Sequence, residues 1–120
     1  MMKKDFLLYI NDMLDAIALV EEYVSNVEEE EFSKDTEKQD SVIHRLMIIG
    51  EAATHLPDDI RGLSPDTQWK AIVAFRNVAI HEYSGVSLGT VWKIVQEELP
   101  ILKTQLVILK DEITYRKNIS

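Results

Sequence analysis

The 120-residue chain contains no cysteine, only four glycines and three prolines, and no long uninterrupted run of apolar residues. The absence of thiols excludes disulfides, thiolate nucleophiles and zinc–thiolate sites, and it is typical of a cytoplasmic protein. A membrane-spanning helix needs about 18 or more consecutive apolar residues, so no membrane span is expected. The N-terminal residues lack a continuous apolar block and a small-residue cleavage site, which predicts that the chain carries no secretory signal.

A surplus of basic residues is also missing. The net charge is −8, whereas a general nucleic-acid binder usually presents a basic face. Much of the acid lies in residues 28–40, while residues 41–81 hold four basic and four acidic side chains. The centre of the chain is therefore locally neutral. This permits a small anion site there and disfavours a long groove that tracks a phosphate backbone.

Helical periodicity dominates the rest of the pattern. Hydrophobic residues make up 46% of the chain and charged residues 28%, an ordinary balance for one globular domain covering residues 1–120. Apolar residues recur at intervals of three and four, which predicts helices over residues 4–27, 35–56, 67–81 and 87–113. Pro100 is expected to break or kink the last helix. With no strand pattern and no internal repeat, the sequence predicts an all-α, up-down bundle of four to five helices.

Local signals refine these helices. Gly50 interrupts the second helix, where a glycine costs about 1 kcal/mol relative to alanine, so we expect another helix to approach closely there. Thr36, with a glutamine three residues later, fits a capping box, and Ser87 is a good N-cap for the last helix. The acidic run 28–31 has no periodicity. We interpret it as a solvated helix end or loop that Phe32 anchors to the core.

Polar chemistry concentrates between Arg76 and Tyr83, at the end of the third predicted helix. This stretch holds a guanidinium, a carboxamide (Asn77), an imidazole (His81) and a phenol within eight residues. On a helix with about 100° per residue, Arg76 and Tyr83 are nearly in register, and Asn77 and His81 are neighbours. Arg76 and His81 lie about 140° apart, and a helix that loosens at His81 would bring them closer. The spacing therefore allows one shared rim but does not require it.

This combination suits the cleavage of an RNA phosphodiester. Arginine offers a charged fork that matches a phosphate, and histidine transfers protons at neutral pH. The imidazole would act on the ribose 2′-hydroxyl or the leaving oxygen, while the guanidinium stabilises charge on the phosphorane. No metal is required, and no recognised metal-ligand spacing is present. The alternative is structural: Arg76 caps carbonyls at the helix end or pairs with Glu82 or Glu51, and His81 stabilises the helix dipole.

Other polar and aromatic residues have structural interpretations beside the functional ones. Glu51 either orients Arg76 or Arg45 or forms an ordinary ion pair. Arg45 either extends the anion site or lies outside it. Two histidines and two tryptophans are interpreted as surface, packing or core residues rather than as catalytic or base-stacking groups: His44, His55, Trp69 and Trp92.

A larger set of residues resembles a known family over more than half of the chain, in collinear order. The matching residues are Arg45-Leu46, Ile49-Gly50-Glu51-Ala52, Leu56-Pro57, Pro65, Trp69-Lys70-Ala71-Ile72, Arg76-Asn77, His81-Glu82-Tyr83, Val91-Trp92-Lys93-Ile94 and Leu99-Pro100-Ile101-Leu102. From Ser41 to Leu109 the chain thus resembles the HepT-like branch of the HEPN (higher eukaryotes and prokaryotes nucleotide-binding) superfamily. The resemblance implies an all-α ribonuclease toxin, usually a homodimer. We expect it to work without a cofactor.

The same resemblance implies roles for individual residues. The family's catalytic arginine and histidine fall on Arg76 and His81, and its polar residue after the arginine falls on Asn77. Two copies of the motif would face each other across the dimer and form one composite cleft. A minimal nucleotidyltransferase antitoxin is implied to transfer AMP onto Tyr83. The added anion would occupy the phosphate site and repel RNA.

These features together predict a metal-independent endoribonuclease toxin that acts on RNA and is silenced by its antitoxin partner. The net charge of −8 favours a runner-up, a non-catalytic helical module that binds a nucleotide or the nucleotidyltransferase in the same cleft. A third hypothesis is a structural dimerisation domain, in which Tyr83 and His81 would both be dispensable.

Overall fold

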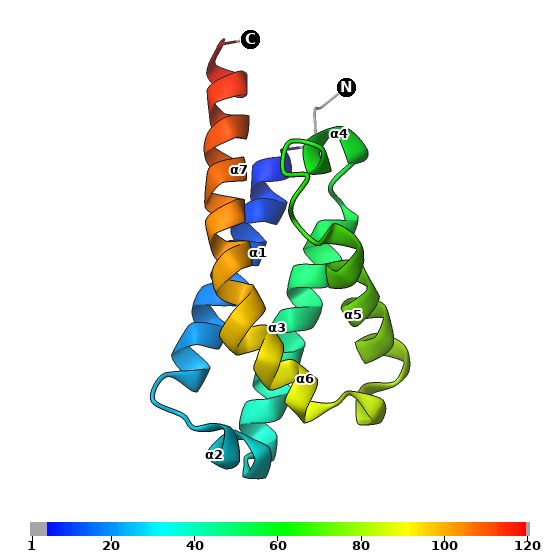
Figure 1. The fold of residues 1–120 in the computed structure, drawn as a ribbon. Coiled ribbons are helices and arrows are strands. Elements are labelled where there is room, and N and C mark those ends of the chain that lie inside the picture. Colours follow the sequence, from blue (N-terminus) through cyan, green and yellow to red (C-terminus); the bar gives the residue numbers. More distant parts are fainter. Residues whose placement is uncertain (1–4, 120) are drawn as a thin grey trace.

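The fold is known from a computed structural model that describes residues 5–119, and these residues form helices and turns without a strand (Figure 1). The elements are α1 (Phe6–Val24), α2 (Glu29–Lys34), α3 (Thr36–Thr54), α4 (Asp58–Arg61), α5 (Trp69–His81), the 3-10 turn η1 (Tyr83–Gly85), α6 (Leu88–Lys93), the π-helical segment η2 (Ile94–Glu98) and α7 (Leu99–Ile119). The predicted all-α bundle is confirmed. Within the described range, no helix has the length and apolar character needed to cross a membrane.

Side-chain caps fix where the long helices begin. Asp5 accepts a hydrogen bond from the Leu7 N–H at 3.0 Å and starts α1, so the expected beginning of this helix at Lys4 falls outside the described residues. Asp35 accepts from the Lys38 N–H at 3.0 Å and starts α3. The predicted capping box was therefore wrong by one residue, because the aspartate is the N-cap. Ser87 caps α6 as expected, accepting from the Thr90 N–H at 3.3 Å.

The acidic run forms a helix of its own. Glu29, Glu30 and Glu31 make up the first turn of α2, where the helix dipole favours negative charge. Residues 28–31 are exposed and form the N-cap and first turn of α2, which confirms the expected solvated helix end. The separate helix was not predicted, because six residues are too few to show a periodic apolar stripe. Phe32 is fully buried, as predicted, and its ring lies 5.2 Å from the ring of Trp92.

One core joins α1, α3 and the α6–α7 run, while α5 packs on the far side of α3 from α1 (Figure 1). The buried side chains of this core include Ile10, Met13, Ile17 and Val20 from α1, Val42, Leu46, Ile49 and Ala53 from α3, and Val91, Val95, Leu102, Leu106 and Leu109 from α6 to α7. Trp69 is buried and its indole donates to the carbonyls of Arg61 and Ser64 at 3.2 and 3.1 Å. The interpretation of both tryptophans as packing residues is confirmed.

The interruption expected at Pro100 takes the form of a wider helical turn. The chain stays helical from α6 to α7, and η2 lies immediately before the proline. Proline lacks the N–H that would complete an i→i−4 hydrogen bond. Val91, Val95 and Leu99 are all buried, yet two successive steps of four residues drift by about 80° around an α-helix. A π-helical turn holds more residues than an α-turn and compensates for this drift.

Candidate functional site

Gly50 brings α5 against α3 at Arg76. A Cβ atom added to Gly50 would overlap the Cβ of Arg76 and lie only 3.1 Å from the Ile72 carbonyl oxygen. The close helix approach predicted from this glycine is confirmed, and it occurs at the arginine of the polar motif. The first atoms of the Arg76 side chain, Cβ and Cγ, are thereby packed closely against the middle of α3.

The guanidinium of Arg76 is held at both of its outer nitrogens. Nη2 donates to Oε2 of Glu51 on α3, and Nη1 donates to Oδ1 of Asn77 at 2.9 Å. Glu51 also faces Nε2 of His55 at 3.5 Å, and the His55 ring stacks on Tyr9 with 4.7 Å between ring centroids. Of the two arginines considered as partners for Glu51, the structure selects Arg76. His55 is a packing residue, as interpreted.

His81 is the last residue of α5 and is exposed to solvent. The helix remains intact through His81, and Glu82 is its C-cap with φ −139° and ψ 56°. No loosening brings the imidazole toward Arg76. Five residues on a regular helix separate two positions by about 140° and about 7.5 Å along the axis. Within one chain, the guanidinium and the imidazole therefore lie on different sides of α5.

Tyr83 reaches back to α3 and contacts Asp40. Its phenol donates a hydrogen bond to Oδ1 of Asp40 at 2.5 Å, although 44% of the tyrosine remains exposed. Burial and then the hydrogen bond and negative charge of Asp40 raise the pKa of Tyr83 to about 12, because each disfavours the phenolate. The phenol is therefore protonated and remains a donor at neutral pH.

Asp40 is the residue at this site that sequence reasoning missed. It lies eleven residues before Glu51 on α3, a spacing that returns to within about 20° of the same helix face. That spacing was the available signal, but without the fold nothing connected it with Arg76 and Tyr83. One face of α3 thus carries two carboxylates, one for each end of the motif.

Arg45 lies on another side of α3. It is half-buried, and five residues from Asp40 amount to about 140° around the helix. Across residues 5–119, no hydrogen bond or ion pair joins it to the motif. A role for Arg45 in the anion site stays a prediction. His44 is exposed, as interpreted from the sequence.

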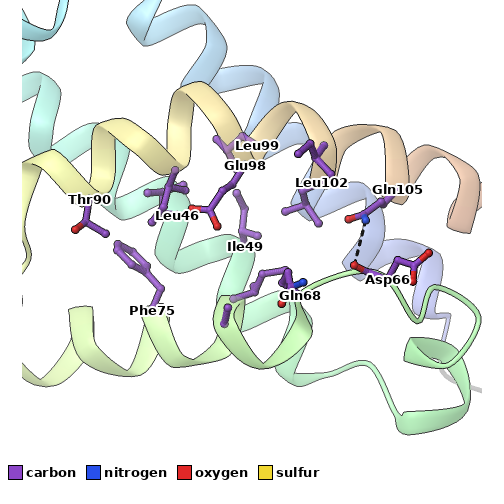
Figure 2. A pocket seen from close by; sticks show the side chains of 14 residues that line it. Leu46, Ile49, Asp66, Gln68, Phe75, Thr90, Glu98, Leu99, Leu102 and Gln105 are labelled. Atoms are coloured by element: carbon purple, nitrogen blue, oxygen red, sulfur yellow. Dashed lines mark hydrogen bonds between the residues drawn. The ribbon is translucent and has the colours of Figure 1, made fainter.

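An apolar groove of about 450 Å³ runs between α5 and the α6–α7 run, with α3 as its floor (Figure 2). Leu46 and Ile49 form the floor, and Phe75 faces Thr90 near one end. At the other end, Nε2 of Gln105 donates to the Asp66 carbonyl at 3.3 Å. Neither Arg76 nor His81 lines this groove. In the described part of the chain, no group of three or more histidines and carboxylates is arranged to hold a metal ion.

Comparison with protein families assigns residues 13–108 to the family described as "Ribonuclease HepT-like". Because this match covers most of the 120 residues, the chain belongs to the HepT-like ribonucleases of the HEPN superfamily. The family suggested by the resemblance is confirmed.

Individual relatives agree with this assignment. The chain is 38% identical over 102 residues to "Probable ribonuclease HepT" of Thermococcus cleftensis, covering 85% of this chain and 93% of that protein. It is 34% identical over 109 residues to "Putative RNase MJ1380" of Methanocaldococcus jannaschii, covering 91% and 100%. "Gamma-glutamylcyclotransferase and putative RNase MJ0434" of the same organism is 37% identical over 117 residues. That match covers 98% of this chain, which spans only 53% of the relative. No solved structure matches the chain.

Proposed function

We propose that the chain is a metal-independent endoribonuclease toxin in which Arg76 and His81 carry the reaction. Membership of a ribonuclease family supports the reaction class. The observation that carries the assignment of roles is a guanidinium held against α3 by Glu51 and Asn77, five residues from a solvent-exposed imidazole. A fixed positive charge and a group that accepts and donates a proton are the two groups that phosphodiester cleavage needs.

The proposed chemistry balances without a metal. His81 Nε2 or Nδ1 accepts the proton of the ribose 2′-hydroxyl as that oxygen attacks phosphorus. Negative charge on the phosphorane oxygens is stabilised by the guanidinium of Arg76. The bond to the 5′-oxygen then breaks, the leaving oxygen takes the proton from the imidazolium, and a cyclic phosphate remains on the other fragment.

We propose further that the working site is shared by two copies of the chain in a homodimer. The angle of about 140° between Arg76 and His81 on one helix is poor for gripping a single phosphate. A two-fold axis beside the C-terminal half of α5 would let Arg76 serve the partner subunit's His81. The exposed apolar side chains Val78 and Ile80 on the same half-helix support contact with a second copy.

Cleavage of cellular RNA in the presence of EDTA tests the assignment. His81→Ala and Arg76→Ala are each expected to lower the rate by about 10² or more. His44→Ala is the matched control, because His44 is exposed on α3 and has no place in the mechanism; its rate should equal that of the wild type. Equal cleavage by all of these proteins would refute the roles of Arg76 and His81.

Mixing the two inactive variants tests the shared site. If Arg76 serves the partner subunit's His81, a mixed dimer of the two variants contains one intact pair. After exchange of subunits, about a quarter of the wild-type rate should return. A mixture that stays as inactive as its components would contradict the composite cleft while leaving the ribonuclease assignment in place.

We also propose that a nucleotidyltransferase antitoxin silences the enzyme by transferring AMP to Tyr83. Tyr83 is 44% exposed as a residue and lies two residues beyond His81, so an added phosphate would stand beside the proposed anion site and repel RNA. Mass spectrometry of the protein co-expressed with its partner is expected to find the adduct on Tyr83. An adduct on another residue would remove this mode of regulation.

A second candidate is a non-catalytic helical module that binds a nucleotide or the nucleotidyltransferase through the same surface. The net charge of −8 favours it, since bulk acidity weakens attraction to RNA. A tight complex with ATP and the partner, formed by a wild-type protein that cleaves no RNA, would select this alternative.

A further inference from the structure

Two carboxylates on one face of α3 contact the two ends of the polar motif. Glu51 pairs with Arg76, and Asp40 accepts from Tyr83. Asp40 and Glu51 are eleven residues apart, which places them about 16 Å apart along α3 and nearly in line. Because the earlier carboxylate meets the later motif residue, α3 and α5 run antiparallel. α3 therefore acts as a straight support for the whole segment from Arg76 to Tyr83.

The chain that leaves α5 has few other constraints. Its backbone hydrogen bonds are local: Glu82 N–H to the Val78 carbonyl at 2.7 Å, Gly85 N–H to the Glu82 carbonyl at 2.9 Å, and Val86 N–H to the Tyr83 carbonyl at 3.2 Å. No residue of η1 is buried, and Val86 is only half-buried against the core. Local turns of this kind set the shape of a segment but not its position relative to the rest of the fold.

The bond from Tyr83 to Asp40 supplies that missing constraint. It joins positions 43 residues apart and has an oxygen–oxygen distance of 2.5 Å. A hydroxyl that donates to an ionised carboxylate forms a strong hydrogen bond. It anchors the chain two residues beyond His81, so it restricts the last turn of α5, on which the imidazole is carried.

We propose that Asp40 is a positioning residue for RNA cleavage, acting through Tyr83 to fix the end of α5 and thus the imidazole of His81. This inference rests on the proposed ribonuclease function. Asp40 acts on Tyr83 rather than on RNA, so it affects the placement of a catalytic group and not the affinity for substrate. The two carboxylates of α3 then have different roles: Glu51 holds the guanidinium of Arg76, and Asp40 holds the turn that follows His81.

The hydrogen bond between Tyr83 and Asp40, called the tether from here on, would also be lost when AMP is transferred to Tyr83. In that reaction Tyr83 Oη bonds to the α-phosphorus of a nucleoside triphosphate, pyrophosphate leaves, and the phenolic proton is lost. The modified oxygen no longer donates to Asp40, and the new phosphate is repelled by the same carboxylate. Modification would therefore release the end of α5 in addition to blocking the phosphate site.

The test compares Asp40→Ala, Tyr83→Phe and the double variant in RNA cleavage. Each single change is expected to lower kcat by about tenfold with KM unchanged, because a catalytic group loses its placement. The double variant should be no slower than either single one, since both remove the same bond. Losses that multiply in the double variant, or losses confined to KM, would overturn the proposal.

Two further variants separate the hydrogen bond from the charge. Asp40→Asn keeps an oxygen that accepts from the phenol and should retain most of the wild-type kcat. Glu37→Gln removes one negative charge from the same helix at an exposed position and should leave kcat unchanged. If Asp40→Asn were as slow as Asp40→Ala, the charge rather than the tether would be responsible, and the proposal would fail.

Amide hydrogen exchange tests whether the bond between Tyr83 and Asp40 restrains the end of α5, even if the protein cleaves no RNA. In Asp40→Ala the amides of Glu82, Gly85 and Val86 should exchange faster than in the wild type, while those of α3 keep their protection. Unchanged exchange at these three amides would overturn the tether. An inactive wild type with faster exchange in the variant would instead refute the proposed function and leave the tether intact.

Discussion

The two ends of the polar motif are fixed to the same helix by different means. Arg76 packs the Cβ and Cγ atoms of its side chain against Gly50, so shape complementarity determines its place. Tyr83 is 44% exposed and depends on a single hydrogen bond to Asp40. Substitution of Gly50 at the first end should therefore act through the stability of the fold. Substitutions at the second end should act through the position of His81 and leave the fold largely intact.

The largest effect is expected for Gly50→Ala, which breaks the packed end. The added methyl group overlaps the Cβ of Arg76 and crowds the Ile72 carbonyl. The Arg76 Cβ and the Ile72 carbonyl oxygen cannot turn aside as the end of a flexible side chain can. The overlap is therefore relieved only if α5 moves away from α3. Thermal or denaturant unfolding should show a loss of about 1–3 kcal/mol, accompanied by loss of RNA cleavage.

Gly89→Ala is the control for that substitution. The nearest atom to a Cβ at Gly89 is Oγ of Ser87 at 3.8 Å, an ordinary contact. Since alanine favours a helix over glycine by up to about 1 kcal/mol, this variant should be as stable as the wild type or more stable. Equal destabilisation by both alanines would show that the close approach at Gly50 is unimportant.

Removal of the Glu51 carboxylate should have an intermediate effect. The ion pair is partly exposed, with 27% of the Arg76 side chain and 51% of the Glu51 side chain accessible, so Glu51→Ala should cost less than about 1 kcal/mol in stability. RNA cleavage should fall several-fold because the guanidinium loses its orientation. Glu51→Gln retains an acceptor oxygen and should recover part of the rate.

Hydrogen exchange then distinguishes the two ends directly. In Glu51→Ala the amides around Arg76 should keep their protection, because packing against Gly50 still holds that part of α5. Faster exchange there, comparable to the change expected at residues 82–86 in Asp40→Ala, would mean that both ends depend on their carboxylates equally.

The smallest effect is a shift in the titration of Tyr83. Its pKa of about 12 in the folded protein lies above the ordinary value of 10.0, so its contribution to stability is complete below pH 10 and is lost as the pH rises toward 12. Asp40→Asn should lower this pKa toward 10 by removing the adjacent charge. Absorbance titration checks it, with Tyr83→Phe identifying the signal among the four tyrosines. An unchanged titration would mean that Asp40 has little influence on the phenol.

Features that depend on local pattern were predictable from the sequence. The long helices follow from apolar residues at intervals of three and four, and Ser87 and Gly50 were recognised because capping and close helix contact each have a residue signature. The polar motif was found because its members are neighbours in sequence. The contact between Glu51 and Arg76 was anticipated as one of two options, and the fold selected between them.

Features that depend on tertiary arrangement were not predictable in the same way. Asp40 lies 43 residues from Tyr83, and an isolated exposed aspartate on a helix has no distinguishing pattern. The helix α2 is too short for periodicity to reveal it. The apolar groove arises where α5, which packs on α3, faces α7, which packs on α1, and no single stretch of sequence encodes this arrangement.

The π-helical segment before Pro100 sets the rotational phase of everything that follows it. Each residue removed from η2 would turn α7 by about 100°, carrying Leu102, Leu106 and Leu109 out of the core and exposing them to water. Ile94 and Glu98 of the same segment line the apolar groove, so the groove's wall depends on the same count of residues. A deletion in η2, unlike one in a surface loop, would rotate the side chains of α7 along the whole helix.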